Sequence, residues 1–74
     1  MANMVDVREE ICSGPVLKVK IKLNQMAPDE VLEVLATLSS KDDITRIFGK
    51  ILGHQIVSIE SQDNDFRILI KKKG

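Results

Sequence analysis

The chain has few of the residues that mark secreted domains or nucleic-acid-binding proteins. Among its 74 residues are one cysteine, two phenylalanines and no tryptophan or tyrosine. A single cysteine cannot form an internal disulfide, which excludes a disulfide-stapled secreted domain. So few aromatic rings give little surface for stacking nucleic-acid bases. The 11 basic and 11 acidic side chains cancel, so net charge does not support direct nucleic-acid binding either.

Long apolar runs and targeting signals are also missing from the sequence. No apolar run exceeds three residues, so we expect no membrane-spanning segment. The start, MANMVDV, lacks the basic and apolar regions of a signal peptide, and we therefore expect a cytoplasmic protein with a reduced thiol. The length predicts a single domain over residues 1–74, with a thin core because such a chain buries only about 60–65% of its unfolded surface.

The segment 15–26 fits two structures. Val19, Ile21 and Leu23 alternate with lysines, which is typical of a strand. Val19, Leu23 and Met26 also lie on one stripe of a helix, and Pro15 suits a first helical turn. The length of about twelve residues, between Gly-Pro and Ala-Pro-Asp, favours a three-turn helix.

A second helix is predicted by apolar residues spaced i, i+3, i+4, i+7 and i+8, which are Ile44, Ile47, Phe48, Ile51 and Leu52. Ser39 or Ser40 can cap this helix, and Gly53 can end it. We expect Asp42 and Asp43 in its first turn, where negative charge is favourable. Strands are predicted over 4–7, 30–36, 55–60 and 66–71, with the last two joined by a turn over 61–65.

The resulting order, βαβαββ, predicts an α/β (α+β) two-layer sandwich. Two helices would cover one face of a four-stranded mixed sheet, because strands joined through a helix are parallel. The other face would be open, and alternation assigns to it Val31, Glu33, Leu35, Arg67, Leu69 and Lys71. Among these we select Val31, Leu35, Arg67 and Leu69 as a possible partner surface.

Cys12 directly precedes the predicted start of the first helix. If Pro15 opens that helix, Ser13 or Gly14 caps it, and its free N–H groups would stabilise a thiolate. Arg8 and Lys18 add positive charge nearby, whereas Glu9 and Glu10 oppose it, so the direction of the thiol pKa shift stays open. A lone cysteine is also often a small buried hydrophobe, and that interpretation stays open too.

His54 follows the glycine that would end the second helix, so we interpret it as part of the helix terminus rather than as a partner of Cys12. One cysteine and one histidine do not make a metal-ligand pattern, and we expect no metal and no cofactor. The basic residues 71–73 are interpreted as a solvated chain end.

The run VDVREEICSGPVLKV resembles the signature of the TusA/SirA-like sulfur-carrier family, a strand ending Asp-x-Arg-Gly followed by Cys-Pro-x-Pro and a helix. Asp6, Arg8, Cys12 and Pro15 match that signature. The pairs Asp43-Ile44 and Gly53-His54 and the turn Pro28-x-Glu30 extend the resemblance along the chain. It implies that Cys12 accepts sulfane sulfur as a persulfide from a cysteine desulfurase or rhodanese-like donor and passes it to an acceptor protein.

Three positions depart from the family pattern. Ser13 replaces the first motif proline, Glu9 replaces the glycine after Arg8, and Leu38-Ser39 stands where the family has Asp-Pro. We favour a monomeric sulfurtransferase that keeps its thiol chemistry with altered partners, in tRNA thiolation, cofactor synthesis or another sulfur pathway. The alternative hypothesis is a non-catalytic protein- or RNA-interaction module that uses the open sheet face.

Overall fold

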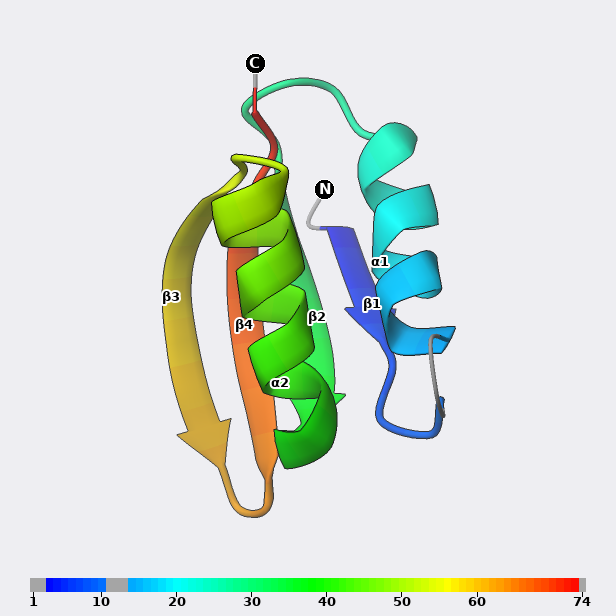
Figure 1. Ribbon diagram of the computed structural model, residues 1–74, viewed down its shortest axis with the longest axis vertical. Helices are drawn as coiled ribbons and strands as arrows, with labels where there is room; N and C mark the ends of the chain where they lie inside the picture. The colour runs from blue at the N-terminus through cyan, green and yellow to red at the C-terminus, as the bar shows by residue number, and fades with distance from the viewer. Residues whose placement is uncertain (1–2, 11–13, 74) are drawn as a thin grey trace.

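An open sheet with helices on one side forms the framework of the chain (Figure 1). The computed structural model describes residues 3–10 and 14–73, and its elements follow the predicted βαβαββ order. Their bounds are β1 Asn3–Asp6, α1 Gly14–Asn24, β2 Val31–Thr37, α2 Leu38–Ile44, the π-helix η1 Thr45–Ile51, β3 Gln55–Gln62 and β4 Asp65–Lys71. No helix in this part of the chain is long and apolar enough to cross a membrane.

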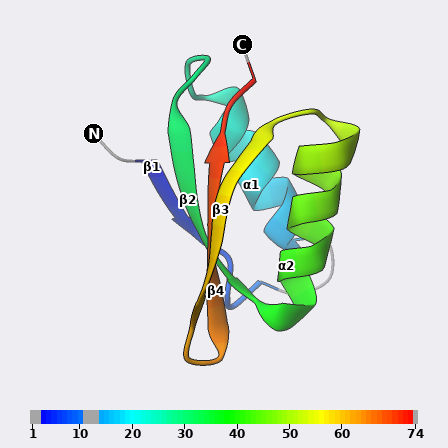
Figure 2. The same ribbon diagram turned by 90° about the vertical axis from the view of Figure 1, so that its left-hand side faces the viewer.

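The strands lie in the order β1-β2-β4-β3. β1 is parallel to β2, and β4 is antiparallel to both of its neighbours. β3 is therefore parallel to β2, with β4 between them, as expected for strands joined through a helix. The helices lie together on one side of the sheet (Figure 2). The predicted two-layer sandwich with a four-stranded mixed sheet is confirmed.

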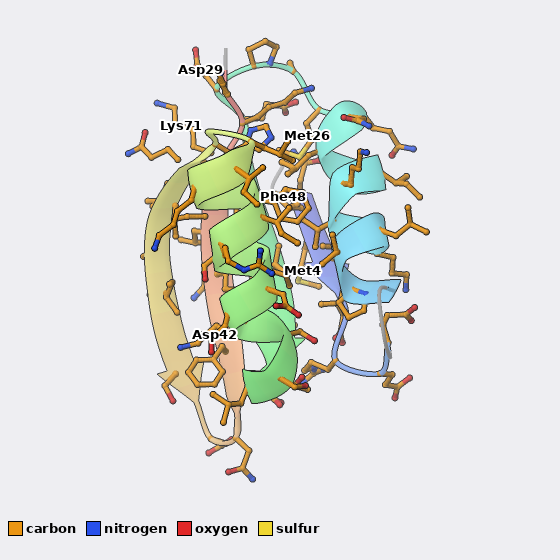
Figure 3. The ribbon with its side chains drawn as sticks, viewed as in Figure 1. Met4, Met26, Asp29, Asp42, Phe48 and Lys71 are labelled. Atoms are coloured by element: carbon orange, nitrogen blue, oxygen red, sulfur yellow. The ribbon has the colours of Figure 1, made fainter. Side chains whose placement is uncertain are left out.

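The core fills the layer between helices and sheet. Phe48 and Met26 lie between the two helices (Figure 3). The other buried apolar residues are Val7, Val19, Leu23, Leu32, Val34, Ala36, Ile44, Ile68 and Ile70. On β2, Leu32, Val34 and Ala36 alternate with the residues assigned to the open face, and all three are fully buried.

The first helix forms where the sequence predicts it. Val19 and Leu23 are buried, whereas Ile21, which the strand interpretation would place beside them, is half exposed. The helix is therefore the correct interpretation, although it ends at Asn24 and not at Met26. A tight turn ends it, because the N–H of Met26 donates to the carbonyl of Leu23 at 3.1 Å. The carboxylate of Glu30 then accepts a hydrogen bond from the N–H of Ala27 at 2.6 Å, which fixes the chain before β2.

The second helix begins earlier than predicted, so the serine-cap prediction is wrong. α2 starts at Leu38, directly after β2, and its N-cap residue is Thr37 without a side-chain cap hydrogen bond. The Thr37 hydroxyl instead lies 3.0 Å from that of Ser39 inside the helix. Asp42 and Asp43 consequently fall beyond the first turn, which contains no acidic residue.

The second helix also changes its winding, which corrects the predicted apolar face. Ile44 and Phe48 are buried, but Ile51 is 64% exposed and Leu52 is 41% exposed. In η1 each turn holds about one more residue than an α-turn, since its hydrogen bonds join i and i+5, as between Leu52 N and Ile47 O at 2.9 Å. Ile51 and Leu52 are therefore more exposed than α-helical spacing would leave them. Gly53 ends the helix as predicted, with φ of +78°.

The hairpin is longer than predicted, and its turn is shorter. β3 extends to Gln62 and β4 begins at Asp65, which leaves only two residues between them. Asp63 takes a positive φ of 55°, a conformation that short-chain polar residues tolerate in turns. A bulge interrupts β3 between Ile56 and Ser58.

The C-terminal lysines are more structured than a solvated tail. Lys71 closes β4, where it is paired with Val31 of β2. The backbone N–H of Lys72 donates to the carbonyl of Glu30 at 2.8 Å, and its ammonium group donates to the carbonyl of Met26. The prediction of a solvated chain end is therefore wrong for these two residues.

Candidate functional site

The predicted site lies between the end of β1 and the start of α1. Val7 continues the strand pairing, because its N–H donates to the carbonyl of Leu35 at 2.9 Å. The chain then turns, with the N–H of Glu10 donating to the carbonyl of Val7 at 3.2 Å. The predicted nucleophile Cys12 and its neighbour Ser13 lie outside the described residues, so their surroundings define this region.

Arg8 is held by two carboxylates. Its Nε donates to Asp6 Oδ1 at 3.0 Å and its Nη2 to Asp6 Oδ2 at 2.8 Å, which is a two-point pairing. A third guanidinium nitrogen, Nη1, donates to Asp65 Oδ2 at 3.1 Å, although these residues are 57 positions apart. Arg8 therefore connects the loop before α1 to the start of β4, and the sequence alone did not reveal its partner Asp65.

The same contacts fix the turn after β1. The backbone N–H of Arg8 also donates to Asp6 Oδ1, at 3.0 Å, which forms a local turn around the aspartate. The Arg8 side-chain hydrogen bonds, followed by this backbone hydrogen bond, lower the pKa of Asp6 to about 2. In return, hydrogen bonds from Asp6 and Asp65 raise the pKa of Arg8. The positive charge that the sequence places near Cys12 is therefore already balanced by two neighbours.

Glu10 and Lys18 form a second ion pair at the start of α1. Lys18 Nζ lies 3.4 Å from Glu10 Oε2. The Glu10 side chain also packs against Gly14, since a Cβ built on Gly14 would lie 3.2 Å from Glu10 Oε1. Glycine at position 14 therefore allows this close approach. Glu10 is therefore half-buried, whereas Glu9 is exposed to solvent.

The helix start itself provides hydrogen-bond donors. α1 begins at Gly14, two positions after Cys12 in the sequence, and Pro15 is buried in its first turn. The N–H groups of a first turn have no acceptor within their own helix, because helical acceptors lie four residues earlier. This turn contains no acidic residue of its own. It is thus suited to an anion, with Glu10 as the opposing charge.

The second predicted cluster lies on the open face of the sheet. Strand register pairs Leu35 with Arg67, and Val31 with Lys71. Val31 is 40% exposed, while Leu35 and Leu69 are half-buried. Arg67 lies between two carboxylates, 3.2 Å from Glu33 and 3.4 Å from Glu60. The structure therefore gathers Val31, Leu35, Arg67 and Leu69 on one surface, separate from the helices.

The two clusters meet at one edge of that surface. Asp6 is in register with Leu35 across the β1–β2 pairing, and Asp65 of β4 is in register with Thr37 of β2. The Arg8 ion pairs therefore lie beside the open face, while Gly14, Pro15 and Lys18 belong to the helical layer.

His54 helps to end the second helix, as interpreted from the sequence. Its backbone N–H donates to the carbonyl of Phe48 at 2.8 Å. Its side chain has another partner, because Nδ1 accepts a hydrogen bond from the N–H of Lys73 at 3.0 Å. Burial and the charges of Lys72 and Lys73 lower the pKa of His54. Within residues 3–10 and 14–73, no three histidine, cysteine or acidic side chains are grouped to hold a metal ion.

Comparison with known proteins extends the resemblance over the chain. The family model described as Sulfurtransferase TusA matches residues 3–72. A relative from Archaeoglobus fulgidus, provisionally named a sulfur carrier protein, is 36% identical over 70 residues, which cover 93% of this chain and 94% of the relative. A relative from Thermotoga maritima with the same provisional name is 38% identical over 75 residues, which cover 99% of this chain and 94% of the relative.

Proposed function

Because the chain belongs to the TusA family of sulfurtransferases, we propose that it carries sulfur as a persulfide on Cys12. The observation that supports this most is the start of α1 at Gly14, immediately after the segment that contains the only thiol. A persulfide is an anion, and the free N–H groups of a helix start favour an anion. A reducing compartment such as the cytoplasm, which would keep a lone thiol free, is part of the proposal.

The proposed transfer needs no external oxidant or reductant. The Cys12 thiolate attacks the terminal sulfur of a persulfide on the donor protein, which we take to be a cysteine desulfurase or a rhodanese-like protein. A new S–S bond forms at Cys12 while the S–S bond of the donor breaks and leaves a donor thiolate. The acceptor protein then repeats this exchange on Cys12, for tRNA thiolation, cofactor synthesis or another sulfur pathway.

The residues around Cys12 are assigned supporting roles. Gly14 and Pro15 set the helix start, and Ser13 adds a hydroxyl that can cap the helix. Arg8 positions the loop through Asp6 and Asp65 rather than acting as a free cation. Lys18 offsets the charge of Glu10. In this proposal residues 1–74 act as one domain.

Mass spectrometry tests the proposal directly. After incubation with a cysteine desulfurase and cysteine, the wild-type chain should gain the mass of one sulfur atom, and Cys12→Ser should gain nothing. A double variant, Cys12→Ser with Ser13→Cys, keeps one thiol but moves it by one position, and it should load more slowly. Equal loading of Cys12→Ser and wild type would disprove a persulfide on Cys12.

A binding module on the same fold is the second candidate function, and the open face supports it. Val31, Leu35 and Leu69 offer an apolar surface around Arg67. In that case Cys12→Ala would leave cellular function intact, whereas Leu35→Glu and Leu69→Glu would abolish it. The persulfide proposal requires the opposite result for Cys12→Ala.

A further inference from the structure

β3 is an edge strand with an unused side. It pairs with β4 on one side, and no other strand of the described residues lies beside it. Alternate residues of such a strand direct their N–H and C=O groups outward, where they can pair with another chain. The bulge at Val57 interrupts the regular strand, so the uninterrupted part runs from Ser58 to Gln62.

A groove of about 550 Å³ runs along this edge, between β3 and the second helix. Ile56 and Ile59 of β3 contribute its apolar part, and Ile59 is 45% exposed. Gly49 of η1 brings helix and strand close together, since a Cβ built on it would lie 2.9 Å from Ile56 Cγ1. The groove therefore has apolar side chains next to the outward backbone groups of β3.

Cations dominate the helix side of the groove. Arg46 and Lys50 line it, together with one carboxylate, Asp42. Asp42 is engaged by Lys41 Nζ at 3.4 Å, whereas Lys50 has no ion-pair partner among the described residues. Arg46 reaches Asp43 at 3.3 Å through Nη2, but its side chain stays more than half exposed. A negatively charged ligand therefore complements the helix side of the groove.

His54 lines the groove near its Lys50 end. Its Nδ1 accepts the hydrogen bond from Lys73, so the proton of the neutral ring is on Nε2, which is a donor. The sequence did not single out the residues that line this groove. The pattern that could have identified them is the helical spacing of Asp42, Arg46, Gly49 and Lys50, which places them on one side of the helix beside the apolar stripe.

We propose that β3 and this groove bind an extended, acidic segment of a partner protein, which adds to the sheet as a fifth strand. Backbone groups of the segment pair with Ser58 to Gln62. Every second side chain of the segment faces the helices; the apolar ones among these contact Ile56 and Ile59, and the carboxylates among them pair with Arg46 and Lys50. The site lies at the opposite edge of the sheet from β1, so it is independent of the persulfide proposal.

Three six-residue probe peptides test this inference on the full chain. The first is fluorescein-labelled and reads Glu-Thr-Val-Thr-Glu-Thr, so that both glutamates and the valine lie on one face of a strand. The second has lysine in place of glutamate, and the third is the acidic peptide with alternate backbone nitrogens methylated. Fluorescence anisotropy measures affinity, and amide NMR spectra identify the residues contacted. We expect only the acidic, unmethylated peptide to bind, with the largest shifts from Ser58 to Ser61.

Matched charge variants locate the contact. Lys50→Glu should weaken binding of the acidic peptide about fivefold at low salt, because one exposed ion pair is replaced by a repulsion. Lys20→Glu makes the same charge change on α1 and should leave the affinity unchanged. Cys12→Ser should also bind like wild type, which separates this result from any failure of sulfur loading.

Several results would overturn the inference. These are equal binding of the acidic and lysine peptides, binding that survives methylation, or no binding at about 1 mM peptide. Shifts of β3 amides that grow with protein concentration in the absence of peptide would identify a second copy of the chain as the occupant, and would also overturn it.

Discussion

The two helices cover the same face of the sheet but differ in how they begin and how they are wound. α1 follows β1 after a connection over residues 7–13, whereas α2 starts directly at the residue after β2. α1 is a regular α-helix, whereas the second helix changes to π-helix at Thr45. The first arrangement leaves a helix start beside a loop, which suits chemistry. The second leaves a groove beside an edge strand, which suits binding.

The largest expected effect tests the change of winding in the second helix. Phe48 is 1% exposed, and we expect Phe48→Ala to cost about 3–5 kcal/mol, because it removes a ring from the core and leaves a cavity. That is comparable to the stability that a core of this size supplies, so circular dichroism should report a largely unfolded protein.

Ile51→Ala is the matched control on the same helix. An α-helix would bury Ile51 beside Phe48, but the structure leaves it 64% exposed, so its loss should cost no more than about 0.5 kcal/mol. Equal destabilisation by the two variants in urea unfolding would contradict the π-helical arrangement.

The contrast between the helices explains what the sequence could predict. Val19 and Leu23 are buried as their spacing predicts, because α1 keeps the periodicity on which that prediction rests. The spacing from Ile44 to Leu52 is equally typical of an α-helix. The wider turns of η1 accompany a contact between Gly49 and Ile56 on another element, and a local pattern contains no information about it.

The candidate site likewise contains features that the local sequence predicts and one that it does not. The helix start at Gly14 and the open-face position of Leu35 follow from local pattern and alternation. The pairing of Arg8 with Asp65 joins residues 57 positions apart, and only the folded sheet brings them together. Charge near Cys12 could be counted from the sequence, but its neutralisation by these partners could not.

The second prediction concerns the connection that leads into α1. Arg8 holds the pKa of Asp6 at about 2, below the ordinary value of about 3.9. A lowered carboxyl pKa contributes stability above the unfolded value and loses it as pH falls toward the folded value. Stability should therefore decrease between about pH 4 and pH 2 partly through Asp6.

Thermal unfolding at a series of pH values measures this contribution. Asp6→Asn should flatten the decrease over that range, and so should Arg8→Gln. The pH dependence of stability in the double variant should be no flatter than in either single variant, because both substitutions remove the same interaction. Amide NMR in acid should show changes at Arg8 and Asp65 before changes at Thr37 to Ser40, where α2 begins without ion pairs from a loop. A slope unchanged by Asp6→Asn would contradict the role given to this pair.

The smallest expected effect concerns the reactivity of the thiol. Glu10 packs against Gly14 at the start of α1, whereas Glu9 is exposed to solvent. Removing the Glu10 charge should therefore favour the Cys12 thiolate more than removing that of Glu9. We expect Glu10→Gln to speed alkylation by iodoacetamide near neutral pH about two- to fivefold, and Glu9→Gln by less than about twofold.

Arg8→Ala should slow the alkylation of Cys12, because Asp6 and Asp65 would lose their counter-charge. Equal effects of the two glutamine variants would contradict the placement of Glu10, and a thiol that reacts only in denatured protein would identify Cys12 as a buried hydrophobe.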